Sequence, residues 1–292
     1  MTSRPSPVDR VPAPLLVIGA VASVQTGSAV ARTLFDELGA SGVVLLRLGL
    51  SCLLLLAVLR PRFWQWSRAS LQSAVLLGVA MAGMNSVFYL AIRTVPLGVA
   101  VTVEFVGPLL VALVQTRRWR DLAWVALAAS GVALLGLDGS GAPLAGLALA
   151  FLAGLFWGAY ILASANVGAR LPGTGGLAVA LLVSTVLVLP FGAAGAAHAF
   201  TDPWLLLGGL GVALLSSVVP YGAELAALRR IPTRVFGVLM SLQPAGGALA
   251  GLLVLGQTLG VREVVALVLV SLASVGVTLG RRRDGVPTQP LD

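Results

Sequence analysis

Apolar runs of membrane-spanning length dominate this sequence. A transmembrane helix needs about 20 mainly apolar residues, and in lipid every backbone polar group must find a partner within the protein, which favours helices. Such runs, bounded by Arg, Pro or Gly, occupy residues 14–34, 41–59, 70–92, 96–116, 121–137, 143–163, 174–193, 203–228, 232–254 and 261–279. The sequence therefore predicts an all-α membrane protein with ten transmembrane helices.

The composition excludes an ordinary soluble protein. Of the 292 residues, 58% are hydrophobic and 10% are charged, whereas soluble domains carry roughly 25% charged residues. The net charge of +8 comes from 19 basic residues, all of them Arg, that stand mainly in short loops. We therefore expect a lipid bilayer and no nucleic acid as a partner. The single Cys52 excludes an intramolecular disulfide.

The arginines also orient the chain. With ten spans both termini share one side of the membrane, and the loops of that side hold most of the arginines. They are Arg4, Arg10, Arg60, Arg62, Arg68, Arg117, Arg118, Arg120, Arg170, Arg229, Arg230, Arg281, Arg282 and Arg283. Trp64, Trp66 and Trp119 fall at the same boundary, as interfacial anchors do. Because cytoplasmic loops are enriched in basic residues, we expect an inner-membrane protein with both termini, including a tail of residues 280–292, in the cytoplasm.

Two similar segments indicate an internal repeat. Residues 91–96 read AIRTVP and residues 227–232 read ALRRIP, and each segment is followed twelve residues later by another proline, Pro108 or Pro244. Five helices separate the copies, so the copies have opposite orientations. The pattern predicts two inverted five-helix repeats, residues 1–140 and 141–279, an arrangement typical of secondary transporters. A proline inside a helix removes a hydrogen bond and kinks the helix, so Pro108 and Pro244 are candidate hinges.

Glu104 is the ionisable residue that most needs an explanation. It lies eight residues after Pro96, about 12 Å along a helix and so close to the middle of the membrane. A charged side chain there costs roughly 2.5–3.5 kcal/mol on insertion scales. Three interpretations are open: Glu104 attracts the ammonium group of a substrate, exchanges a proton for substrate, or is the structural partner of a buried Arg.

Three further charged residues lie in or beside apolar runs. Arg47 could pair with Glu104, extend to the outer surface, which we favour slightly, or bind a substrate carboxylate. Glu224 stands near the cytoplasmic end of its span, where an ion pair with the neighbouring arginines and a role in an inner gate are equally open. Arg234, two residues past Pro232, is interpreted as an interfacial anchor or as the partner of Glu224.

Neutral polar and aromatic side chains supply the remaining candidates for a substrate site. A polar group inside an apolar span needs a hydrogen-bond partner, and aromatic rings can close over a substrate or merely pack. The candidates are Gln25, Ser28, Asn85, Tyr89, Trp157, Tyr160, Tyr221 and Gln243. Asn85 and Tyr89 are four residues apart and would share one helix face as a lining pair.

Motifs of other classes do not occur in the sequence. A phosphate-binding loop with Lys, a nucleophile elbow and a His-Glu-x-x-His metal motif are all missing. We therefore expect no enzyme, no metal site and no cofactor, and transport driven by a gradient.

Two segments resemble a known family closely. Residues 83–108, GMNSVFYLAIRTVPLGVAVTVEFVGP, and residues 231–244, IPTRVFGVLMSLQP, together with Pro220-Tyr221 and Glu224, are similar to the threonine/homoserine exporter branch of the drug/metabolite transporter superfamily, the EamA-type carriers. The resemblance implies ten helices in two inverted repeats. The sequence departs from the family pattern at Gln243 and Gln257, where that pattern has acidic residues. A Gln side chain cannot titrate.

The resemblance further implies a function. The first hypothesis is a secondary transporter that exports threonine, homoserine or similar small amino acids from the cytoplasm by alternating access, coupled to protons or driven by the substrate gradient alone. The alternative hypothesis is an exporter of another small metabolite or drug.

Overall fold

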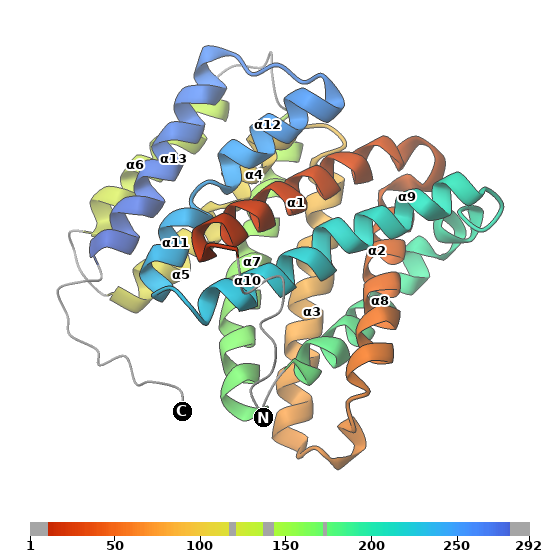
Figure 1. Cartoon of the computed structure of the whole chain (residues 1–292). Coiled ribbons are helices and arrows are strands. Elements are labelled where there is room, and N and C mark those ends of the chain that lie inside the picture. The colour runs from red at the N-terminus through yellow and green to blue at the C-terminus, as the bar shows by residue number, and fades with distance from the viewer. Residues whose placement is uncertain (1–10, 117–120, 137–142, 172–173, 281–292) are drawn as a thin grey trace.

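The computed structural model describes residues 11–116, 121–136, 143–171 and 174–280 (Figure 1). Within these ranges every regular element is a helix. The elements are α1 Ala13–Thr33, α2 Phe35–Leu59, the 3₁₀ helix η2 Phe63–Gln65, α3 Arg68–Ala91, α4 Leu97–Glu104, α5 Val106–Thr116, α6 Asp121–Gly136, α7 Leu144–Arg170, α8 Gly175–His198, α9 Pro203–Ala213, the π-helix η3 Leu214–Val218, α10 Val219–Leu228, α11 Thr233–Met240, α12 Gln243–Leu255 and α13 Val261–Gly280.

The helices have the length and surface of membrane spans. Among the described residues, eight helical stretches are long and apolar enough to cross a bilayer, if α9 to α10 and α11 to α12 are each taken as one stretch, and two shorter apolar stretches cover residues 97–112 and 122–135. Large apolar side chains such as Val58, Phe191 and Leu253 are more than 70% exposed on the outside of the bundle. An exposed apolar surface of this extent needs lipid around it. The chain is therefore a multi-pass membrane protein, as the sequence predicts.

Three of the expected spans are not continuous α-helices. The span at 96–116 is interrupted between α4 and α5, the span at 232–254 between α11 and α12, and the span at 203–228 by the π-helix η3. Proline explains each site, because it has no N–H for the carbonyl four residues earlier. Pro108, Pro244 and Pro220 thus leave the carbonyls of Glu104, Met240 and Ser216 without a helical partner.

Other boundaries differ in simpler ways. α7 continues to Arg170, beyond the expected end at residue 163, and stops where Leu171 takes an extended conformation. Pro172 follows in the sequence, and the residue before a proline is pushed out of the helical region. α2 begins earlier than expected, but Gly39 is non-helical with φ 66°, so the straight part of the helix starts where the sequence predicts it.

Glycines allow the closest helix contacts. A Cβ atom on Gly107 of α5 would collide with the backbone of Gly154 on α7, and one on Gly154 would collide with the carbonyl of Glu104. α4 packs in the same way on α12, where a Cβ on Gly98 would stand 2.7 Å from Cα of Ala248. Small residues let membrane helices approach to backbone contact. The interrupted helices are therefore held at the centre of the bundle.

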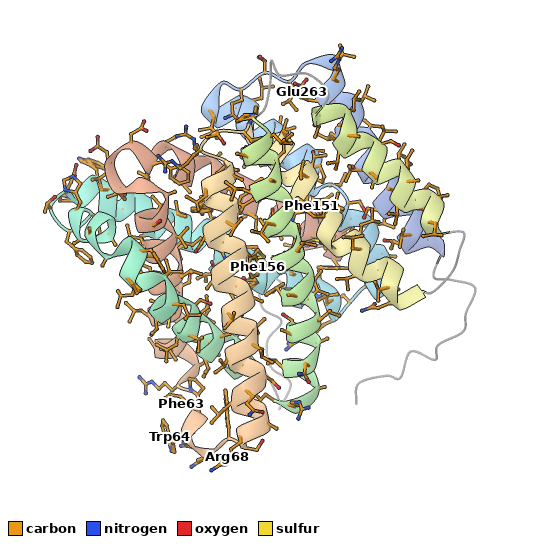
Figure 2. The ribbon with its side chains drawn as sticks, turned by 180° about the vertical axis from the view of Figure 1, so that it is seen from behind. Phe63, Trp64, Arg68, Phe151, Phe156 and Glu263 are labelled. Atoms are coloured by element: carbon orange, nitrogen blue, oxygen red, sulfur yellow. The ribbon has the colours of Figure 1, made fainter. Side chains whose placement is uncertain are left out.

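The remaining helices surround this centre. α2 packs against α8, α3 against α7 and α8, and α1 against α10 and α12. α6 and α13 form a separate outer pair (Figure 1). Figure 2 shows Phe63, Trp64 and Arg68 at one end of the molecule and Glu263 at the opposite end. The helices thus run between an end with aromatic and basic side chains and an end with the acidic Glu263.

Candidate functional site

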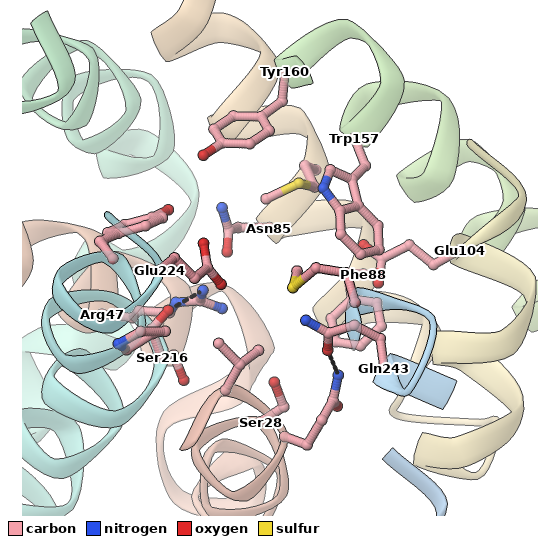
Figure 3. Close-up of a pocket in the computed structure, with 16 residues that line it drawn as sticks. Ser28, Arg47, Asn85, Phe88, Glu104, Trp157, Tyr160, Ser216, Glu224 and Gln243 are labelled. Atoms are coloured by element: carbon pink, nitrogen blue, oxygen red, sulfur yellow. Dashed lines mark hydrogen bonds between the residues drawn. The ribbon is translucent and has the colours of Figure 1, made fainter. Parts of the chain in front are cut away.

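A polar cavity of about 120 Å³ lies where the interrupted helices meet (Figure 3). Its walls come from α1, α2, α3, α4, α7, η3, α10, α11 and α12. The lining residues are Val24, Gln25, Ser28, Arg47, Met84, Asn85, Phe88, Glu104, Trp157, Tyr160, Ser216, Pro220, Tyr221, Glu224, Met240 and Gln243. Residues from both halves of the sequence therefore share one site.

The structure brings together almost all candidate substrate residues. Those that line the cavity are Gln25, Ser28, Arg47, Asn85, Glu104, Trp157, Tyr160, Tyr221 and Gln243. Tyr89 is the exception, because it is not among the lining residues although it shares a helix face with Asn85. It is fully buried behind the wall, where its hydroxyl accepts a hydrogen bond from Arg47 Nη1 at 3.2 Å. Tyr89 therefore positions Arg47 without bordering the cavity.

Arg47 lies inside the bundle instead of at the outer surface. Its side chain is 7% exposed, and its Nη2 donates to the carbonyl oxygen of Ser216 at 3.0 Å. That carbonyl is available because Pro220 cannot donate to it. The guanidinium also lies 5.6 Å from the ring centroid of Tyr89, a favourable cation–π arrangement. The slight preference for an outward-extending Arg47 is thus wrong, because the π-helix offers it an internal acceptor.

Glu104 lies on a different wall from Arg47. It is the last residue of α4 and is 8% exposed. Within the described residues, Arg47 uses its hydrogen bonds on Tyr89 and Ser216 instead of pairing directly with Glu104. The cavity therefore presents a fixed cation and a carboxyl group at separate positions.

A pair of amides closes a further part of the wall. Gln25 Nε2 of α1 donates to Gln243 Oε1 of α12 at 2.6 Å, and both side chains are buried. Ser28 lies one helical turn after Gln25 and lines the same region. Gln257, the second departure from the family pattern, is elsewhere: its Oε1 accepts from the backbone N–H of Leu97 at 2.9 Å and caps α4. Only Gln243 therefore bears directly on what the cavity binds.

Several lining atoms have unused hydrogen-bonding capacity. Within the described residues, four buried side-chain atoms have no hydrogen-bond partner, and three of them belong to cavity residues: Gln25 Oε1, Arg47 Nε and Ser216 Oγ. Buried polar atoms are nearly always paired in folded proteins. Their concentration here is typical of a site whose polar contacts change with a ligand or a second conformation.

A second cavity of about 330 Å³ adjoins the first one. The two cavities share Trp157, Tyr160, Glu224 and Met240. The second cavity extends from these residues toward Gln115 near the end of α5, Phe236 near the start of α11 and Thr278 near the end of α13. The shared residues thus lie between the smaller central cavity and the larger second cavity.

The remaining predicted residues have different positions. Pro108 lines the second cavity, and Pro244 is a buried residue in the first turn of α12. Glu224 contributes to both cavities instead of standing apart at the surface. Arg234 belongs to α11, but its side chain lies outside the described residues, as does the tail of residues 281–292.

Sequence reasoning missed Ser216, Met84, Phe88 and Met240. Ser216 had a usable signal, because a Ser four residues before a Pro in an apolar span marks a carbonyl that the helix cannot satisfy. The apolar members gave none, since Met and Phe in a spanning helix can equally face lipid. Among the described residues no group of three or more His, Cys, Asp or Glu could hold a metal ion.

A bundle of spanning helices that are interrupted around a small central cavity with polar groups in its walls is the architecture typical of secondary transporters. The EamA-like transporter family matches residues 144–279. The chain is 44% identical over 275 residues to the threonine/homoserine exporter RhtA of Salmonella typhimurium LT2, and 43% identical to that of Escherichia coli K12, each covering 92% of both chains. The chain belongs to the EamA-like transporter family, and the resemblance seen in the sequence is confirmed.

The fold has a relative among solved structures. One crystal structure aligns with a TM-score of 0.61 at 18% identity, covering 94% of this chain and 99% of the other. At this identity the match concerns the fold alone. Membership of a transporter family agrees with the expectation that the protein is not an enzyme.

Proposed function

We propose that this protein exports threonine, homoserine or related small amino acids from the cytoplasm. The central cavity carries this proposal, because it combines a fixed guanidinium with carboxyl groups at separate positions. A volume of about 120 Å³ is well below the roughly 300–1,000 Å³ of pockets for drug-sized ligands. The curated relatives are named threonine/homoserine exporters, which supports the same substrate class.

The two ends of an amino acid match the two charged positions. Arg47 presents its guanidinium to the cavity and binds the substrate carboxylate, since a fork of N–H donors suits a carboxylate. Glu104 attracts the ammonium group from its own wall. Trp157 and Tyr160 close over the bound molecule, and Asn85, Ser28 and Tyr221 complete its polar surroundings.

The proposed architecture is ten transmembrane helices in two inverted repeats, residues 1–140 and 141–279. α4 and α11 support it: each has eight residues, starts after a proline with nearly identical dihedral angles and ends four residues before another proline. Glu104 and Met240 are the last residues of these helices, and both line the cavity.

The helix packing supports the same repeat. If α1 corresponds to α7, and α3 to α9 and α10, then the contact of α3 with α7 has its counterpart in the contact of α1 with α10. Likewise the contact of α5 with α7 corresponds to that of α1 with α12. Inverted repeats of this kind rock about a site at their interface.

This arrangement supports the proposal of alternating access. The second cavity leads toward the ends of α5 and α13 and the start of α11, and the loops that adjoin these helix ends in the sequence are rich in Arg. These loops face the cytoplasm in the proposed orientation, with both termini inside and the protein in the inner membrane. Trp157, Tyr160, Glu224 and Met240 then form the inner gate, and the interruptions near Pro108 and Pro244 are its hinges.

Glu104 is also the candidate for energy coupling. A carboxyl group at the substrate site can carry either a proton or the attraction for an ammonium group, so that proton uptake and substrate release compete. Transport down the substrate gradient alone needs no such exchange. The pH dependence of transport distinguishes the two modes.

Efflux of labelled threonine and homoserine, from cells with and without the protein, tests the proposed function. We expect faster efflux of both amino acids in the cells that contain it. Equal efflux would overturn the amino-acid assignment and favour the alternative, an exporter of another small metabolite or drug.

A further inference from the structure

The second cavity is larger and less polar than the central one. Its volume is about 330 Å³, against about 120 Å³ for the central cavity, and lies within the roughly 300–1,000 Å³ typical of small-molecule pockets. Among the described residues that line it, only Glu224 is charged, and Glu224 stands where the two cavities meet. Most of the remaining wall is apolar, with side chains such as Leu109, Val111, Phe236 and Val277. This cavity therefore suits an apolar group.

A packed apolar cluster supports its wall. Phe105, Leu109 and Val277 belong to one buried cluster, and Trp157 packs against it. The rings of Phe105 and Trp157 meet edge to face, with their centroids 5.5 Å apart and an angle of 69° between the planes, which is a favourable aromatic geometry. Trp157 lines both cavities, so this contact holds the indole at their junction.

The central cavity has a polar end and an end that meets the second cavity. At the polar end Gln25 and Gln243 are joined by their 2.6 Å hydrogen bond, and Figure 3 shows Ser28 across the pocket from Tyr160. At the other end the aromatic side chains of Trp157 and Tyr160 border both cavities. A bound molecule that is longer than the central cavity therefore has room to extend past these two side chains.

We propose that the second cavity binds the apolar side-chain extension of an elongated amino acid whose carboxylate and ammonium groups occupy the central cavity, and that such a ligand blocks the transporter instead of being exported. The proposal rests on the proposed function and adds a class of ligand to it, amino acids with an apolar ring or chain at the end of the side chain. O-benzylhomoserine, which is homoserine with a benzyl group on its side-chain oxygen, is the probe.

Occupation of both cavities at once accounts for the block. In the proposed mechanism Trp157, Tyr160, Glu224 and Met240 form the inner gate, and this gate must close behind the substrate before the site opens to the outside. A ring that lies among Trp157, Tyr160 and Met240 keeps them apart. Aromatic and thioether side chains also make favourable contacts with a ring. The same ring therefore strengthens binding and prevents transport.

Displacement of labelled homoserine from the purified full-length protein in detergent measures the gain in affinity. Burial of a large apolar group corresponds to about tenfold or more in affinity. O-benzylhomoserine should therefore displace the label at a concentration at least about tenfold lower than that of unlabelled homoserine. An equal or higher concentration would overturn the proposal.

Counterflow into proteoliposomes, in which unlabelled homoserine inside drives the uptake of label from outside, measures the loss of transport. We expect uptake of labelled homoserine and little uptake of labelled O-benzylhomoserine, although the benzyl ether binds more tightly. Uptake by vesicles without protein is subtracted, because an apolar compound can cross the bilayer by itself. Equal rates for the two compounds would overturn the block.

Two variants test where the ring binds. Ala112 and Thr278 line the second cavity and not the central one, so Ala112→Phe and Thr278→Phe each add a ring to its wall. In either variant the advantage of O-benzylhomoserine over homoserine should disappear, and the second variant covers the case in which the first does not fold. Ala129→Phe is the matched control, because Ala129 is exposed on α6 and lines neither cavity. It should keep the wild-type advantage.

The outcomes separate this inference from the proposed function. An advantage that stays intact in both cavity-filling variants overturns the second cavity as the site of the ring. Homoserine that binds and exchanges, with no advantage for its benzyl ether, overturns this inference and leaves amino-acid transport standing. A wild-type protein that exchanges neither threonine nor homoserine overturns the proposed function and this inference with it.

Discussion

Arg47 Nη2 donates to the carbonyl oxygen of Ser216 across 3.0 Å of protein interior. Pro220 makes this bond possible, because its missing N–H leaves that carbonyl without a partner inside the helix, and the π-helix η3 turns the residues before Pro220 away from regular geometry. The first half of the chain thus satisfies a backbone group of the second half. The same contact holds the guanidinium beside the cavity.

Replacement of Arg47 should impair both stability and transport. Arg47→Ala leaves the carbonyl of Ser216 buried without a donor, at a cost of about 1–3 kcal/mol, and removes the proposed partner of the substrate carboxylate. Arg47→Lys keeps the charge but lacks the fork of donors, so we expect a smaller loss of stability and a raised half-saturation concentration. Thermal unfolding in detergent and threonine counterflow measure the two effects.

Arg60→Ala is the control for Arg47. Arg60 is exposed, and its Nε donates to the carbonyl of Ala57 at the end of its own helix. Both measurements should stay at the wild-type values. Counterflow of Arg47→Ala at the wild-type rate would remove Arg47 from the substrate site.

Glu104→Gln should abolish transport or make it independent of pH, while the protein still inserts into the membrane. The amide keeps the size of the side chain but carries no charge and exchanges no proton. Initial rates of threonine efflux over a range of external pH values, together with the amount of protein in the membrane, provide the measurement. Glu37→Gln, at an exposed position, should behave as the wild type. An unchanged rate and pH profile in Glu104→Gln would return Glu104 to a structural role.

Gly154→Ala should destabilise the bundle strongly. The added Cβ would collide with the carbonyl of Glu104, and forcing extra volume into a packed interior costs about 1–3 kcal/mol or more. Because Glu104 would be displaced, we also expect slower counterflow. Gly211→Ala is the matched control, since nothing lies within 4 Å of a Cβ at Gly211. Equal unfolding temperatures for the two variants would contradict the close contact of α4 with α7.

The proposed orientation can be tested with cysteine labelling. Cys52 is the single cysteine of the sequence, so Cys52→Ser gives a cysteine-free background. A membrane-impermeant maleimide added to intact cells, after the outer membrane is opened, should label Thr201→Cys and should label Phe63→Cys only once the inner membrane is permeabilised. The opposite pattern would place both termini outside the cytoplasm.

Parts of this site were readable in the sequence. Glu104, Arg47 and Gln25 stand out because a polar group in an apolar span needs a reason to be there, and the structure places all three on one cavity. The repeated proline spacing also predicted where helices deviate, and the interruptions at 105 and at 241–242 lie beside those prolines. The chemistry of the residue and its immediate sequence neighbours was therefore sufficient to predict these features.

Other assignments needed the packed bundle. Tyr89 and Asn85 share a helix face, yet only Asn85 borders the cavity, because α2 places Arg47 against the hydroxyl of Tyr89. Arg47 itself was expected to extend outward, since the sequence does not show that the carbonyl of Ser216, 169 residues away, lies beside its guanidinium. Gln25 and Gln243 are 218 residues apart, and nothing in either segment predicts that they meet.

The sequence by itself thus determined that this protein is a multi-pass, all-helical membrane protein and which family it resembles, because run length, charge and proline position act locally and survive without tertiary contacts. The tertiary structure alone decided which polar groups share the cavity and which carbonyl holds Arg47. Those relationships depend on how closely glycine-rich helices approach one another, and that distance is set by the packing of the whole bundle.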